Sequence, residues 1–91
     1  MLKTQNYDSK LIDMRLEVIT PDAKLFEGEV TSVVAPGIDG YLGILKDHAP
    51  MISTLKEGEL TFTTANGKED KLDLKGGVLE VKANKISVLA D

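Results

Sequence analysis

Hydrophobic and polar residues alternate along most of the chain from Met14 onward. A period of two places successive side chains on opposite faces of an extended strand. The alternation is clearest in residues 15–19, 60–64, 71–75 and 86–90. The side chains expected to face a core there are Leu16, Val18, Leu60, Phe62, Leu72, Leu74, Ile86, Val88 and Ala90. β-branched residues are frequent in these runs and favour a pleated, half-buried surface. The pattern therefore predicts an all-β fold.

Turn-forming residues separate the strand patterns. Asn66-Gly67 favours a two-residue type I′ hairpin, because both residues tolerate positive φ. Further turns or bulges are expected at Glu27-Gly28, Pro36-Gly37, Glu57-Gly58, Gly76-Gly77 and Asn84-Lys85. No long segment shows helical periodicity, although a short turn is expected near residues 46–49. The spacing of turns predicts about eight to ten short strands packed as two sheets.

The length of the chain, 91 residues, corresponds to one domain. Residues 1–13 are polar, with a few scattered apolar side chains, and Met14 is an alternative start. We therefore expect an extension without assigned function over residues 1–13 and a β-sandwich domain over residues 14–91.

Composition and charge exclude several classes of function. Acidic residues outnumber basic ones, 15 to 11, and the two kinds are interleaved, whereas nucleic-acid binding needs clustered positive charge. There is no cysteine, which excludes disulfides and thiolate metal sites. No apolar run reaches the roughly 18 residues of a membrane helix. The N-terminus also lacks the apolar stretch of a signal peptide. We expect no nucleic-acid partner and a chain that does not itself span a membrane, which leaves docking on a membrane complex open.

The central segment, residues 36–50, contains most of the candidate chemistry. Its glycines at 37, 40 and 43 match neither a dinucleotide fingerprint nor a phosphate loop, so they are interpreted as turn and bulge positions. His48, beside Asp47, is a conceivable general base. No nucleophile accompanies it, and neighbouring residues of a strand point to opposite faces. One histidine with scattered carboxylates also makes no recognised metal site. We expect no catalytic residue, metal or cofactor.

The residues after His48 leave two interpretations open. Pro50 marks a sheet edge or a strand start, because proline lacks the N–H that a ladder needs. Met51 and Ile52 beside it belong either to the core or to an exposed docking patch.

The order of motifs resembles the epsilon subunit of F-type ATP synthases over residues 14–91. The matching segments are LEVITP (16–21), LFEGEV (25–30), GYLGIL (40–45), HAP (48–50), LKEG (55–58), GGVLEV (76–81) and VLAD (88–91). The resemblance implies a ten-stranded β-sandwich of two mostly antiparallel sheets. It also implies a non-catalytic subunit of the rotor's central stalk, which couples ion-driven rotation of the c ring to the gamma subunit and ATP synthesis.

The resemblance further implies partners and a location. The partners are the gamma subunit and the ring of c subunits, and a stable homo-oligomer is not expected. The location is peripheral, on the cytoplasmic, stromal or matrix face of the energy-coupling membrane. Tyr41 stands where family members often place an acidic residue facing the c ring. Two alternatives are open there: Asp39 supplies the charge instead, or Tyr41 packs and forms a hydrogen bond. The residues expected to face gamma are His48, Ala49, Pro50, Met51 and Ile52.

Family members normally continue past residues 88–91 into a two-helix hairpin that inhibits ATP hydrolysis. This sequence stops at Asp91, so we expect it not to inhibit by inserting a C-terminal helix. Two other classes of function stay open. A stand-alone ligand-binding β-sandwich needs a concave apolar pocket with convergent polar groups, and the sequence shows no sign of one. A hydrolase would use His48 with Asp39 or Asp47.

Overall fold

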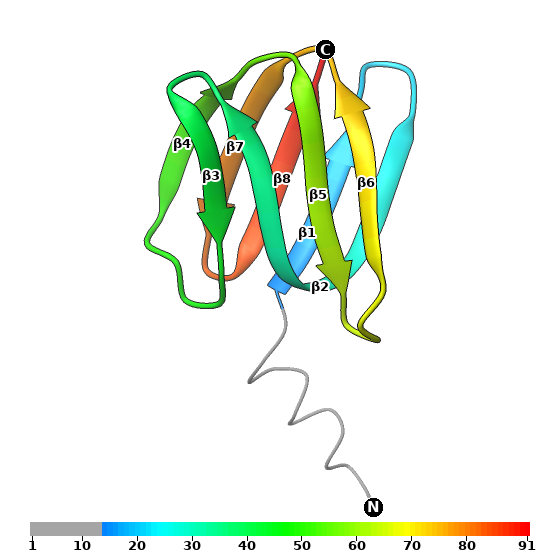
Figure 1. The fold of residues 1–91 in the computed structure, drawn as a ribbon, viewed down its shortest axis with the longest axis vertical. Helices are drawn as coiled ribbons and strands as arrows, with labels where there is room; N and C mark the ends of the chain where they lie inside the picture. Colours follow the sequence, from blue (N-terminus) through cyan, green and yellow to red (C-terminus); the bar gives the residue numbers. More distant parts are fainter. Residues whose placement is uncertain (1–13) are drawn as a thin grey trace, which may run out of the picture.

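The computed structural model describes residues 14–91, which form eight β-strands (Figure 1). The strands are β1 (Met14–Ile19), β2 (Lys24–Gly37), β3 (Gly40–Ile44), β4 (Met51–Leu55), β5 (Gly58–Thr64), β6 (Glu69–Leu74), β7 (Gly77–Lys82) and β8 (Lys85–Ala90). Within this range no helix is long and apolar enough to cross a membrane. The extension predicted for residues 1–13 lies outside the described residues.

The strands pack as two layers that share β2 (Figure 1). The first half of β2 pairs with β1 and completes a layer in the order β4-β7-β8-β1-β2. The second half pairs with β3 and β5 and forms the other layer, β3-β2-β5-β6. Among the described strands β1 and β8 run parallel, and the other pairings are antiparallel. The predicted sandwich of mostly antiparallel strands is confirmed.

The structure has eight strands rather than ten, and the long strand β2 helps to explain the lower count. Turns or bulges were expected at Glu27-Gly28 and Pro36-Gly37. The first prediction is wrong, because β2 runs through Glu27-Gly28 without a register shift. The second is correct, because β2 ends at Gly37 and the turn to β3 begins there. Gly28 pairs with Leu16, and a Cβ at Gly28 would lie 3.1 Å from the ring of Phe26. A register shift between Val30 and Ser32 marks where β2 passes from one layer to the other.

Side chains from both layers fill the core. The predicted inward positions Leu16, Val18, Leu60, Phe62, Leu74, Ile86, Val88 and Ala90 are buried, and Leu72 packs partly against them. Phe26 and Phe62 join the layers through rings whose centroids lie 4.4 Å apart. The two-residue alternation therefore predicted the core correctly, because each strand covers the core with one face only.

The turns differ from the prediction in type. Thr64 donates its N–H to the carbonyl of Lys68 at 2.8 Å, so the β5–β6 loop contains three residues, 65–67. Gly67 has a φ of 90°, but Asn66 does not have positive φ, and the predicted type I′ turn at Asn66-Gly67 is wrong. Both central residues have positive φ in the β7–β8 hairpin instead, where Ala83 and Asn84 have φ of 51° and 63° between the paired Lys82 and Lys85.

Candidate functional site

The predicted site residues fall into two segments at opposite ends of β3 (Figure 1). Asp39 lies in the β2–β3 turn, and Tyr41 follows in β3 itself. His48, Ala49 and Pro50 lie in the β3–β4 loop at the other end of that strand. A strand of five residues extends about 17 Å. The domain therefore presents the two segments as separate surfaces.

The β2–β3 turn is held tightly against the sandwich. Gly37 pairs with Gly40, and a Cβ at Gly37 would lie 2.6 Å from the carbonyl oxygen of Gly40, so the turn requires glycine there. The N–H of Ile38 donates to the carbonyl of Thr54 at 3.0 Å and ties the turn to β4. Asp39 is exposed at the tip of this fixed turn.

Tyr41 presents most of its side chain to solvent. Its exposed fraction is 63%, and it pairs with Pro36 across the β2–β3 ladder. A Cβ on Gly58 would lie 3.6 Å from the Tyr41 hydroxyl and 2.8 Å from the Pro36 Cβ, so glycine at position 58 leaves room for both side chains. Ile38 is 58% exposed beside them, and the sequence analysis did not select it.

The β3–β4 loop begins with a defined turn. His48 donates its N–H to the carbonyl of Leu45 at 3.1 Å, and Asp47 has a φ of 66°. The short turn predicted near residues 46–49 is thus present. The Asp47 N–H donates to Asn84 Oδ1 at 2.7 Å, which joins this turn to the β7–β8 hairpin. Leu45 is 63% exposed, a position that sequence reasoning missed. The signal was present, since Ile44 is buried and its neighbour must point outward.

The loop does not assemble a hydrolytic centre from the residues proposed for it. The Asp47 carboxylate contacts the ammonium group of Lys46 at 3.0 Å and the Asn84 amide at 3.2 Å. These contacts, that of Lys46 first, lower the pKa of Asp47. His48 Nδ1 lies 2.8 Å from the carbonyl oxygen of Ala49 rather than against a carboxylate. Asp39 is at the other end of β3. Within residues 14–91 no three His, Cys, Asp or Glu side chains could hold a metal ion.

Met51 and Ile52, for which core and docking roles were both open, point to opposite sides of β4. Met51 is partly buried and packs against the core. Ile52 is 72% exposed. A groove of about 410 Å³ runs beside them and is lined by Pro50, Met51, Ile52, Glu80, Val81 and Lys82. The outward side chain of Ile52 and this groove make the most apolar part of the loop's surroundings.

Comparison with known proteins identifies the fold and its relatives. The family profile described as "ATP synthase, Delta/Epsilon chain, beta-sandwich domain" matches residues 13–91. The chain belongs to this family. The sequence is 42% identical to the ATP synthase epsilon chain of Chlorobium limicola over 77 residues, which are 85% of this chain and 88% of that one. It is 49% identical to the epsilon chain of Carboxydothermus hydrogenoformans over 78 residues, 86% of this chain but 58% of that one.

A solved structure contains a chain with the same fold. That chain is one of the Euglena gracilis mitochondrial ATP synthase, in a structure of OSCP, F1 and c-ring. The TM-score is 0.80 at 20% identity, and the match covers 86% of this chain and 50% of that one. The resemblance to epsilon subunits and the β-sandwich inferred from the sequence are thus confirmed. The chain nevertheless spans little more than half the length of several relatives that it matches.

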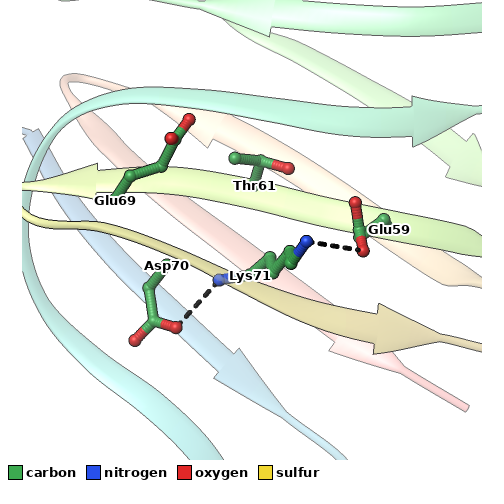
Figure 2. A pocket seen from close by; sticks show the side chains of 5 residues that line it. All are labelled: Glu59, Thr61, Glu69, Asp70 and Lys71. Atoms are coloured by element: carbon green, nitrogen blue, oxygen red, sulfur yellow. Dashed lines mark hydrogen bonds and ion pairs between the residues drawn. The ribbon is translucent and has the colours of Figure 1, made fainter.

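A second hollow of the epsilon-type domain lies on the outer face of β5 and β6 (Figure 2). It measures about 340 Å³ and is lined by Glu59, Thr61, Glu69, Asp70 and Lys71. The ammonium group of Lys71 lies 3.6 Å from a Glu59 oxygen, and the Asp70 carboxylate accepts the Lys71 N–H at 2.9 Å. This hollow is a charged, solvent-exposed strand face rather than the apolar pocket that a stand-alone ligand-binding module requires.

Proposed function

We propose that the chain is a central-stalk subunit of a rotary F-type ATP synthase and couples rotation of the c ring to the gamma subunit. Membership of the delta/epsilon family and the epsilon-chain relatives support the proposal. The structural observation that carries it is the placement of two exposed segments at opposite ends of β3. A rigid body with a contact surface at each end is suited to transmit motion between two partners.

The surface proposed for the c ring consists of the β2–β3 turn and Tyr41. Asp39 supplies the negative charge at the tip of a turn that the Ile38–Thr54 hydrogen bond holds in place. Tyr41 supplies an exposed ring and a hydroxyl that donates or accepts a hydrogen bond. Polar groups of the c subunits would pair with both side chains.

The surface proposed for gamma consists of residues 48–52. Its anchor is Ile52, whose side chain is 72% exposed beside the groove of about 410 Å³. Burying an exposed isoleucine in an interface contributes on the order of 1.5–3 kcal/mol. Met51 supports the segment from the core side.

The location and the limits of activity complete the proposal. The domain acts at the face of the energy-coupling membrane where F1 resides, and it meets the membrane only through the complex. It contributes no catalytic residue, needs no cofactor and does not form a stable homo-oligomer. Residues 14–91 couple the rotor parts and do not by themselves inhibit ATP hydrolysis.

The test of the gamma surface is binding of purified gamma subunit to an Ile52→Asp variant. Aspartate at the anchor removes the apolar contact and introduces a charge that binding must desolvate, so affinity should fall at least about tenfold, or 1.4 kcal/mol. The matched control is Leu25→Asp, because Leu25 is 42% exposed at the opposite edge of the same layer. Its affinity should equal that of the unmodified chain. Equal binding by all three proteins would refute the gamma surface.

The c-ring surface is tested with the same chain reconstituted into membranes that lack this subunit. Asp39→Lys should lower the number of ions pumped for each ATP hydrolysed. The affinity of this variant for isolated gamma should stay unchanged. Recovery of neither gamma nor c subunits with the tagged, unmodified chain from its source membranes would contradict the whole proposal.

A further inference from the structure

Asn84 binds the β3–β4 turn from the far side of the sequence. Its Oδ1 accepts the Asp47 N–H at 2.7 Å, and its Nδ2 donates to Asp47 Oδ1 at 3.2 Å. The two bonds use both polar atoms of the Asn84 amide, and both are made with Asp47, so they form a hydrogen-bonded ring between the two residues. The two residues are 37 positions apart, so the contact joins turns that no local sequence rule connects.

Both partners of this contact are conformationally fixed. Asn84 has a φ of 63° and Asp47 a φ of 66°, and asparagine and aspartate are among the few residues that tolerate this region. The Asn84 carbonyl also accepts the N–H of Arg15 at 2.9 Å, which ties the β7–β8 hairpin to β1. The β3–β4 turn is therefore bound to the β7–β8 hairpin at a residue whose backbone is itself hydrogen-bonded to β1.

We propose that Asn84 is a positioning residue for partner binding: it holds Asp47, and through it the loop residues 48–50, in the conformation that gamma recognises. The proposal rests on the proposed function of those residues. Asp47 immediately precedes His48, so the contact fixes the start of the loop that leads to β4 at Met51. Ordering a loop before binding lowers the entropy lost when the complex forms. Residue 84 thus contributes to affinity without itself being a contact residue for gamma.

The pattern of bonds requires an acceptor and a donor on a side chain of this length. Aspartate at position 84 keeps the acceptor for the Asp47 N–H but sets one carboxylate against another. Glycine at position 84 keeps positive φ without strain and removes both bonds. Exchanging the two residues, as in D47N/N84D, restores the ring with the direction of the side-chain bond reversed.

The experiment compares these variants of the full chain in gamma binding, thermal stability and amide exchange. Asn84→Gly should bind gamma about tenfold more weakly, which is 1.4 kcal/mol, while its melting temperature stays within a few degrees because the hairpin favours glycine there. The Asp47 amide should exchange faster in this variant, whereas the amide of Leu79 on the neighbouring strand should not change. Asn84→Asp should bind at least as weakly, and D47N/N84D should recover most of the affinity.

The outcomes separate this proposal from the proposed function. If Ile52→Asp weakens binding but Asn84→Gly binds like the unmodified chain, the positioning role is wrong and the gamma surface stands. If Ile52→Asp has no effect, the gamma surface itself is wrong. If affinity falls in Asn84→Gly only together with a large loss of stability, or if D47N/N84D recovers nothing, the role of Asn84 is structural and the proposal is overturned.

Discussion

Replacing Gly77 with alanine should destabilise the domain strongly. Gly77 begins β7 with a φ of 144°, a region that residues with a side chain rarely occupy. A Cβ there would lie 2.2 Å from the carbonyl oxygen of Leu89. The backbone conformation costs on the order of 1–3 kcal/mol for alanine. Relieving the overlap costs about 1–3 kcal/mol more, because the ladder between β7 and β8 must shift. We expect a total loss of about 4 kcal/mol.

The same substitution at Gly43 is the control. Gly43 lies within β3, and a Cβ built there has no atom within 4 Å. Alanine in the interior of a strand is favoured over glycine by roughly 0.5–1 kcal/mol, because glycine loses more conformational freedom on folding. Gly43→Ala should therefore be neutral or slightly stabilising.

Urea titrations followed by circular dichroism measure the free energy of unfolding of each variant, and thermal scans measure the melting temperature. A loss of 1 kcal/mol lowers the melting temperature of a domain of this size by about 4–8 °C, so Gly77→Ala should melt about 15 °C or more below the unmodified protein. A Gly77→Ala free energy of unfolding within about 1 kcal/mol of the original would refute the reasoning. An equal loss for Gly43→Ala would refute it as well, since backbone conformation would then not distinguish the sites.

Three further predictions concern the hairpin, the core and a surface ion pair. Ala83→Asn should raise the free energy of unfolding by about 0.5–1 kcal/mol in urea titrations, because Ala83 has a φ of 51° that asparagine tolerates better. Phe62→Leu should lower it by about 1–2 kcal/mol through loss of the ring contact with Phe26, and a change below about 0.5 kcal/mol would contradict that contact. Hydrogen bonds from Lys24 and then Arg15 lower the pKa of Glu27 to about 2. These bonds stabilise the folded state fully at pH values above the pKa of Glu27 in the unfolded chain, and this stabilisation is lost as the pH falls towards 2. The unmodified chain should accordingly exceed Glu27→Gln in urea midpoint at pH 7, and the difference should vanish near pH 2.

The sequence predicted the core because alternation is a local property. Each of Leu16, Leu60 and Ile86 has polar neighbours, and a strand with one buried face must place those neighbours outward. Strand boundaries were harder to predict. Gly28 and Pro36 look like interruptions, yet the aromatic ring of Phe26 covers the first and the pairing of β3 accommodates the second.

The candidate surfaces were predicted in part for a related reason. Tyr41 lies in a recognisable motif, Asp39 and Ile52 lie beside such motifs, and the structure places all three at the surface. The contact between Asp47 and Asn84 could not be predicted, because each residue alone is an ordinary turn former. Their meeting depends on which hairpins the sheet order brings together.

Because β2 pairs in both layers, it affects the cooperativity of unfolding. The part of β2 from Lys24 to Val30 pairs with strands of one layer, and the part from Val30 to Gly37 pairs with strands of the other, so Val30 pairs in both. Separating the layers would therefore expose the shared core. It would also break backbone hydrogen bonds of β2 on both sides of Val30. Partial opening gains little freedom for a large loss of contacts, so the protein should behave as a single cooperative unit that stays whole until it unfolds completely.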